Sequence, residues 1–459
     1  MAYGAGPPSG GRTDGERVTA RKKAIEGIPI RNKLLYTNRH DVHPDGNDTE
    51  VPQLAEYHPL TEPEAIEIAR RIEGVFPPDA ELACREIGDG NLNLVFHVRD
   101  ERSGRSLILK QALPYAKVVG ESWPLTLDRS RIESEALIEE GRLAPGLVPK
   151  VYKYDPDLAL TVMEDLSDHV IMRSGLMQCR RFPLFADHIS TFLANTLFFT
   201  SDLGMNQQEK KLKAGRFINP ELCKITEDLI FDDPYTVSPN NNYEAAIEDE
   251  AEALRTDEKL HFEVALLREK FLTQGQALLH GDLHTGSIFV REDSTKVIDP
   301  EFAYYGPMGF DVGAVIGNLL LNYAGQLHWS ADEASRTSYR EYLLETVKSV
   351  WTQFDRKFRA HWDEKNVDRV ARATAGYQDD YMRRLLRDSI GYAGCKMVRR
   401  IVGLAHVADI DRIPDAAVRE KAQRVALRIG KTLIKENRGA ESIDFVIDTA
   451  REATGELKG

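Results

Sequence analysis

The sequence is poor in cysteine, and its four cysteines are widely separated. Cys84, Cys179, Cys223 and Cys395 form no C-x-x-C pair, so neither a zinc knuckle nor a redox dithiol is expected. So few cysteines in a chain of 459 residues are typical of a protein that keeps its thiols reduced. A cytoplasmic location is therefore predicted.

Long apolar runs and an excess of positive charge are also lacking. Gly313, Gly317 and Asn318 interrupt the most apolar stretch, residues 312–324, which is too short for the ~18 residues of a membrane span. The chain has 60 Lys and Arg against 73 Asp and Glu, a net charge of −13. Nucleic acids and anionic membranes favour basic faces, so neither is expected as a partner.

What is present is the composition of a folded protein. The hydrophobic fraction is 42% and the charged fraction 29%, values too apolar for a disordered chain. The first 15 residues, MAYGAGPPSGGRTDG, are rich in glycine and proline, and no strong apolar period follows them. Residues 1–55 are therefore predicted to be a disordered N-terminal extension.

The order of the expected elements predicts two lobes. Residues 82–163 have strand-like patterns with one inserted helix over residues 128–143, and the chain becomes mainly helical after residue 165. One strand pair, over residues 287–290 and 296–298, interrupts the helices. A small β-rich half followed by a large helical half is an α+β, bilobal pattern, and ligands often bind between such halves. The predicted units are the N-lobe (56–165), the helical C-lobe (166–440) and a C-terminal tail (441–459).

The sharpest motif is HGDLHTGS at residues 280–287, followed by VIDPE at residues 297–301. The strand pair between them returns the chain, so Asp282 and Asp299 can face one site. In phosphoryl transfer one aspartate orients, and accepts a proton from, the attacking hydroxyl, while another holds Mg²⁺ against the ATP phosphates. The motif pair therefore predicts a kinase.

Two other functions compete for these residues. His280, Asp282 and His284 alternate and would share one face of a strand, where they could bind zinc in a metal-dependent hydrolase. Gly281 and Gly286 favour a loop instead. A degenerate kinase fold that only binds ligands is the third possibility, but the lysine and both aspartates that a kinase needs are present.

Further kinase parts follow in the expected order. A glycine-bearing turn at residues 88–93 suits close approach to phosphates. Lys110 ends the expected strand at residues 107–109, where a kinase places its phosphate-binding lysine. Glu133 or Glu135 in the following helix can pair with Lys110, and the sequence does not choose between them. Residues 163–166, at a strand-to-helix transition, are placed to hydrogen-bond adenine as a hinge. The glycine turn, lysine, helix glutamate, hinge and two aspartates occur in the order of a kinase, and chance does not explain that order well.

With these motifs assembled, the chain resembles the 5-methylthioribose kinases, which belong to the aminoglycoside/choline-phosphotransferase branch of the protein-kinase-like fold. The resemblance runs from about residue 60 to residue 438. It rests on strings such as GDGNLNLVFHV, VMEDLSDH, HGDLHTGSIF and KVIDPEFAYYGPMGFDVG. Ser287 agrees with these kinases, whereas the wider branch usually has asparagine there, so an aminoglycoside substrate is disfavoured.

The resemblance implies transfer of the ATP γ-phosphate to the anomeric hydroxyl of 5-methylthioribose in methionine salvage, with Mg²⁺, by a homodimer. Another small-molecule kinase of the same fold is the alternative. Asp282 would be the catalytic base and bind the sugar, together with Trp123, Arg399 and Arg400. The residues implied to contact ATP are Asn93, Lys110, Glu164, Asp165, Leu166, Asp299, Pro300 and Glu301, of which Asp299 and Glu301 would also bind the metal.

Overall fold

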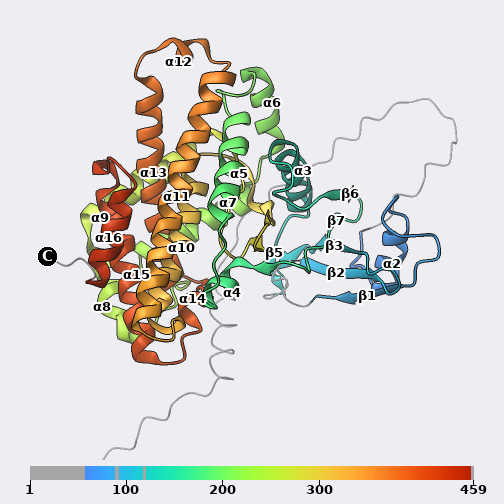
Figure 1. Cartoon of the computed structure of the whole chain (residues 1–459), viewed down its shortest axis with the longest axis horizontal. Coiled ribbons are helices and arrows are strands. Elements are labelled where there is room, and N and C mark those ends of the chain that lie inside the picture. Colours follow the sequence, from blue (N-terminus) through green and yellow to red (C-terminus); the bar gives the residue numbers. More distant parts are fainter. Residues whose placement is uncertain (1–56, 88–92, 117–119, 456–459) are drawn as a thin grey trace, which may run out of the picture.

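The computed structural model describes residues 57–87, 93–116 and 120–455. The predicted N-terminal extension and residues 88–92 of the glycine turn lie outside the described residues. A small lobe built on a sheet and a larger helical lobe lie side by side (Figure 1). The predicted α+β, bilobal fold class is confirmed.

The N-lobe is a five-stranded antiparallel sheet. Alternate residues of its central strands, such as Phe96, Leu109 and Val162, are fully buried against helix α2, as expected when one face of a sheet covers a core. In spatial order the strands are β1 (Leu82–Glu86), β2 (Asn93–Asp100), β3 (Ser106–Ala112), β7 (Leu160–Glu164) and β6 (Val151–Asp155), accompanied by α2 (Glu62–Arg70) and the hairpin strands β4 (Tyr115–Ala116) and β5 (Gly120–Pro124).

Helix α3 (Asp128–Leu143) has the bounds that the sequence predicts. Ile132, Ala136 and Leu137 lie on its buried face, but so do the ionisable residues Glu133 and Glu140. Buried carboxyl groups need partners. The helix therefore carries charge into the interior of the protein, and one of its glutamates reaches the site described below.

The C-lobe is mainly helical, with short strands that frame the catalytic segment. The predicted strand pair is present as β10 (Ile288–Val290) and β11 (Thr295–Val297); the other strands are β8 (Val170–Ile171), β9 (Ala277–Leu279) and β12 (Tyr304–Gly306). The helices are α4 (Met172–Met177), α5 (Phe185–Phe199), α6 (Gln207–Arg216), α7 (Pro220–Thr226), α8 (Glu248–Thr256), α9 (Glu258–Thr273), α10 (Gly309–Trp329), α11 (Glu333–Lys365), α12 (Arg369–Ala373), α13 (Tyr377–Val402), α14 (Ala408–Asp411), α15 (Ala416–Glu436) and α16 (Asp444–Thr454).

Helix α10 is the centre of the C-lobe and packs closely against α13. A Cβ atom added at Gly313 would lie 2.5 Å from the carbonyl oxygen of Ser389, and one added at Gly317 would lie 2.8 Å from that of Ala393. Glycine is therefore required for the two helix backbones to approach this closely. The predicted tail includes α16, which packs on α11 and α15.

No helix within the described ranges is both long and apolar enough to cross a membrane.

Candidate active site

The loop between β9 and β10 is shaped by an aspartate at the start of α10. Asp311 accepts hydrogen bonds from the backbone N–H groups of His280 (2.7 Å) and Gly281 (3.1 Å). Gly281 has a φ of +84°, and a Cβ atom there would lie 2.2 Å from the carbonyl oxygen of Phe302. Glycine is therefore the residue that fits this position, which directly precedes Asp282.

His280 and Ser287 hold the loop from within. His280 Nε2 donates to the carbonyl oxygen of Ile298 (2.8 Å), and its Nδ1 accepts from the backbone N–H of Asp282 (3.2 Å). Ser287 Oγ accepts from the backbone N–H of His284 and lies 3.0 Å from the carbonyl oxygen of Asp282. Ser287, which stands where the wider branch has asparagine, ties the loop together.

The zinc-binding alternative is not favoured by this geometry. Both ring nitrogens of His280 are engaged with the backbone. Across residues 57–87, 93–116 and 120–455, no group of three or more His, Cys, Asp or Glu side chains could hold a metal ion.

The two carboxylate oxygens of Asp282 have different surroundings. Oδ1 lies 3.1 Å from Lys396 Nζ, whereas Oδ2 lies 3.5 Å from His284 Nε2. His284 Nδ1 accepts from the backbone N–H groups of Gly286 and Ser287, so the ring hydrogen is on Nε2. Burial lowers the pKa of His284 to about 3, and the ring is neutral at physiological pH.

Asp282 is an anion in this site. Burial would raise the pKa of its carboxyl group, but the charge of Lys396, with smaller contributions from His284, Arg399 and Arg400, holds it well below its usual range. Asp282 is therefore a weak base that can orient a hydroxyl group.

A basic cluster of Arg173, Lys396, Arg399 and Arg400 lies beside Asp282 and His284, and Arg173 is also ion-paired with the buried Asp409 (3.3 Å). Residues 396, 399 and 400 are three and four apart on α13 and share one face, while Arg173 comes from α4, where its backbone N–H donates to Thr285 O (3.0 Å). Burial lowers the pKa of Lys396 to about 8 and also lowers those of Arg399 and Arg400. Arg399 Nε is buried with no hydrogen-bond partner among the described residues. Such a buried excess of cations suits an anionic ligand.

The structure places both predicted arginines at the site and adds two residues that the sequence reasoning missed. Lys396 and Arg173 were not predicted. Lys396 could have been found, because a helical pattern puts it on the face of Arg399 and Arg400. Arg173 gives no such signal, since it lies on a different helix.

Lys110 joins the N-lobe to the second aspartate. Its Nζ donates to Glu133 Oε1 (2.7 Å) and to Asp299 Oδ1 (2.6 Å). Burial would lower the pKa of Lys110, but the neighbouring carboxylates raise it. Desolvation would raise the pKa of Asp299, but the charge and the hydrogen bond of Lys110, with smaller contributions from His280 and His284, together lower it. The partner in α3 is Glu133; Glu135 accepts instead from Arg216 (2.7 Å).

Asp299 is turned toward the site by an unusual backbone conformation. Its φ is +63° and its ψ is +47°, the left-handed region, which a residue other than glycine adopts at a cost. Pro300 begins a short 3₁₀ turn directly after it. The Asp299 side chain is 46% exposed, so it is open to a ligand. Carboxylate oxygens are the donors that Mg²⁺ prefers, and Asp299 with Glu301 fits such an ion.

Arg129 connects Glu301 with the strand that follows the glycine turn. Its Nη1 donates to Glu301 Oε2 (3.2 Å) and also to Asn93 Oδ1, while Nη2 donates to the carbonyl oxygen of Leu113 (2.9 Å). Asn93, which the resemblance assigns to ATP, is thus held beside the carboxylate of Glu301. No sequence pattern indicates that Arg129 links these segments.

The predicted hinge has its side chains already engaged. Glu164 accepts from Lys296 Nζ (3.0 Å), Asp165 Oδ2 accepts from Ser106 Oγ (2.6 Å), and Leu166 is buried. Only backbone groups of this segment are therefore candidates for adenine contacts. Trp123 lies in β5, but its side chain is outside what the structure describes, and its contact with the sugar stays a prediction.

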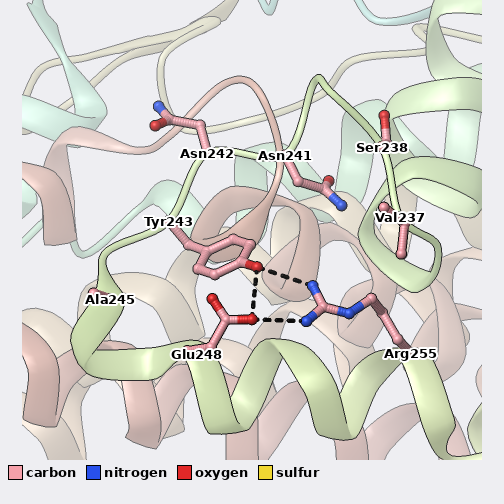
Figure 2. A pocket seen from close by; sticks show the side chains of 8 residues that line it. All are labelled: Val237, Ser238, Asn241, Asn242, Tyr243, Ala245, Glu248 and Arg255. Carbon is pink, nitrogen blue, oxygen red and sulfur yellow. Dashed lines mark hydrogen bonds and ion pairs between the residues drawn. The ribbon is translucent and has the colours of Figure 1, made fainter.

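A separate surface pocket of about 370 Å³ contains none of the predicted site residues (Figure 2). Its charged groups satisfy each other, because Arg255 donates to both Glu248 (2.8 Å) and Tyr243 Oη (2.9 Å). The chemistry described above lies elsewhere, at the two aspartates and the basic cluster.

Comparison with known proteins shows the family of this chain. The model of the phosphotransferase enzyme family matches residues 83–362. A methylthioribose kinase of Geobacillus sp. (strain WCH70) is 53% identical over 378 residues, which are 82% of this chain and 92% of the relative. A methylthioribose kinase of Yersinia enterocolitica is 46% identical over 399 residues, which are 87% of this chain and 100% of the relative. The chain therefore belongs to the phosphotransferase enzyme family and, within it, to the methylthioribose kinases.

Proposed function

We propose that this protein transfers the γ-phosphate of ATP to the anomeric hydroxyl of 5-methylthioribose, giving 5-methylthioribose 1-phosphate and ADP. The observation that carries the proposal is the pairing of each aspartate with a buried lysine, Asp282 with Lys396 at 3.1 Å and Asp299 with Lys110 at 2.6 Å. Such an arrangement supports phosphoryl transfer, in which positioning and charge stabilisation supply most of the catalysis.

Asp282 is the proposed catalytic residue. It orients the acceptor hydroxyl and takes up its proton as the O–P bond forms. An anomeric hydroxyl is more acidic than an ordinary alcohol, so a weak base is sufficient. The low pKa of Asp282 makes it a weak base, which is consistent with a carboxylate that mainly orients the hydroxyl group.

The proposed nucleotide site lies on the N-lobe side. Lys110 and Asn93 contact ATP, and the backbone of residues 164–166 binds adenine. Asp299 and Glu301 hold Mg²⁺, which, when bound, neutralises charge on the phosphates. Lys110 donates a hydrogen bond to Asp299 and Arg129 donates one to Glu301, so both carboxylates are held in place.

The proposed sugar site lies on the C-lobe side. Arg399 and Arg400 stabilise the transferring phosphoryl group, for which the buried excess of positive charge is suited. Trp123 covers the sugar, and its ring can pack against the methylthio sulfur.

We further propose that the protein is a cytoplasmic homodimer of methionine salvage. All four cysteines are free, which supports a reducing compartment. The dimer and the pathway rest on the family alone. Sedimentation equilibrium tests the dimer: a mass near twice 51.7 kDa is expected, and a monomer at micromolar concentration would refute it.

A coupled ADP-release assay over a panel of acceptors tests the substrate. The panel contains methylthioribose, ribose, choline, homoserine and an aminoglycoside, and release is expected with methylthioribose. Asp282→Asn is expected to abolish turnover while ATP binding survives, whereas Asp157→Asn, at an exposed position, should match the wild type. Release with choline but not with methylthioribose would overturn the substrate, and wild-type turnover by Asp282→Asn would overturn the role of Asp282.

A further inference from the structure

Lys396 is a buried lysine that has no role among the residues assigned to the reaction above. It lies on α13, is 3% exposed, and its ammonium group contacts Asp282 Oδ1 at 3.1 Å. Burying a lysine is costly unless its charge is paired and fixed. Because the pair lies beside the reacting centre, its position points to a role in the reaction.

The Lys396 side chain is held on a second side by an aromatic ring. Its Nζ lies 4.4 Å from the ring centroid of Phe310, a distance at which a cation is attracted to the ring face. Phe310 is fully buried in the first turn of α10, next to Asp311, which holds the backbone of His280 and Gly281. The same helix start therefore fixes both the backbone before Asp282 and the cation that binds its side chain.

The contact with Lys396 gives the two oxygens of the Asp282 carboxylate different partners. Oδ1 is engaged by Lys396, while Oδ2 faces the neutral His284 ring at 3.5 Å, longer than an ordinary N–H···O hydrogen bond. The ion pair restrains the orientation of the carboxylate plane, because one oxygen must stay within reach of Lys396 Nζ. Oδ2 is thereby left for a further donor, such as a hydroxyl group.

We propose that Lys396 is the positioning residue of Asp282: it anchors Oδ1 so that Oδ2 is presented to the acceptor hydroxyl, and it keeps the carboxylate an anion. The inference rests on the proposed function, since it assigns Asp282 to the acceptor. It adds a requirement beyond the site residues that the resemblance assigns, namely a charged Lys396.

The charged groups around Lys396 determine the pH range in which its side chain is protonated. It faces Asp282 and His284 from the catalytic loop, Asp311 from α10, and Arg399 and Arg400 from its own helix. Burial lowers the pKa of Lys396 to about 8 despite the opposing charge of Asp282. The ion pair is therefore complete below pH 8 and is lost as the pH rises through this value.

The test compares Lys396→Met and Lys396→Arg. Methionine has similar length and no charge, and kcat should fall on the order of 100-fold because a misplaced carboxylate is a poor orienting group, while the KM for ATP changes less than about threefold. Arginine stays charged at all accessible pH values and should restore at least about a tenth of the activity. Lys357→Met is the control, because Lys357 of α11 pairs with Asp187 of α5 (2.8 Å) and neither residue belongs to the site described above.

The pH profile distinguishes positioning from a purely structural role. Wild-type kcat should fall above about pH 8, and this basic limb should move upward in Lys396→Arg and stay unchanged in Lys357→Met. A Lys396→Met variant with kcat within threefold of the wild type would overturn the proposal. So would a limb near pH 8 that persists in Lys396→Arg, a result that remains available if the methionine variant does not fold.

A second measurement needs no sugar substrate and so separates this inference from the proposed function. The Asp282 carboxyl ¹³C resonance, assigned by its loss in Asp282→Asn, should not titrate between pH 4 and 8 in the wild type. In Lys396→Met its titration should move to higher pH, because burial is then opposed by fewer charges. An unchanged titration would overturn the inference, whereas failure of methylthioribose in the acceptor panel would overturn the proposed function alone.

Discussion

Replacing Gly281 by alanine should displace the catalytic loop. At a φ of +84° an alanine costs about 1–2 kcal/mol. Its Cβ atom would also lie 2.2 Å and 2.7 Å from the carbonyl oxygen and carbon of Phe302, which are backbone atoms that cannot rotate away. Overpacking of this kind typically costs about 1–3 kcal/mol, so the free energy of unfolding should fall by about 2–5 kcal/mol in total.

Gly376→Ala is a matched control for the backbone cost. Gly376 has a φ of +78°, and an added Cβ atom there meets no atom within 4 Å. Only the cost of the left-handed conformation applies, about 1–2 kcal/mol. The difference between the two variants therefore measures the contact with Phe302.

The two variants are compared by urea unfolding and by kcat in the ADP-release assay. Gly281→Ala should lose on the order of 100-fold in kcat, because the clash separates the segments that carry Asp282 and Asp299, and a shift of about 1 Å has such an effect. Gly376→Ala should keep the wild-type kcat. The reasoning is refuted if Gly281→Ala is no less stable than Gly376→Ala and turns over within threefold of the wild type.

Two further predictions concern the nucleotide side. Glu133→Gln removes a buried, charge-assisted partner of Lys110, worth about 1.5–3 kcal/mol, so kcat/KM for ATP should fall about ten- to a hundredfold, whereas Glu135→Gln loses only surface pairs and should stay within threefold; equal losses in steady-state assays would contradict the assignment of Glu133. Asp299→Ala should abolish the Mg²⁺-dependent part of ATP binding in calorimetry, and an unchanged affinity for Mg·ATP would show that Asp299 does not hold the metal.

The elements of the fold that follow local patterns were predictable. The apolar spacing over residues 128–143 predicted α3 with its observed bounds. The strand pair between Asp282 and Asp299 was predicted because two short β-rich runs flank a turn, and it is present as β10 and β11. Both signals depend on residues close together in the sequence.

The choice between Glu133 and Glu135 could not be made from the sequence. Residues two apart on a helix point in different directions, and only tertiary neighbours decide which direction faces Lys110. Arg216, which binds Glu135, lies on α6, a helix whose position the sequence does not give.

The supporting residues of the site were missed for the same reason. Asp311, Lys396 and Arg129 act on groups 30 to 172 residues away in the chain. Helical spacing places Lys396 on the face of Arg399 and Arg400, but it does not show that this face meets Asp282. The contacts of Asp311 and Arg129 likewise follow only from the assembled fold.

The glycine face of α10 has a consequence for the order of folding. Each glycine within a helix weakens it by about 1 kcal/mol relative to alanine, so α10 gains its stability from docking on α13 rather than from its own propensity. That docking joins segments such as Gly313 and Ser389, and contacts so far apart in the chain form slowly. Because Asp311 in α10 shapes the catalytic loop and Lys396 in α13 anchors Asp282, the active site is completed only when these two helices meet. A chain arrested before that step would lack a complete catalytic centre.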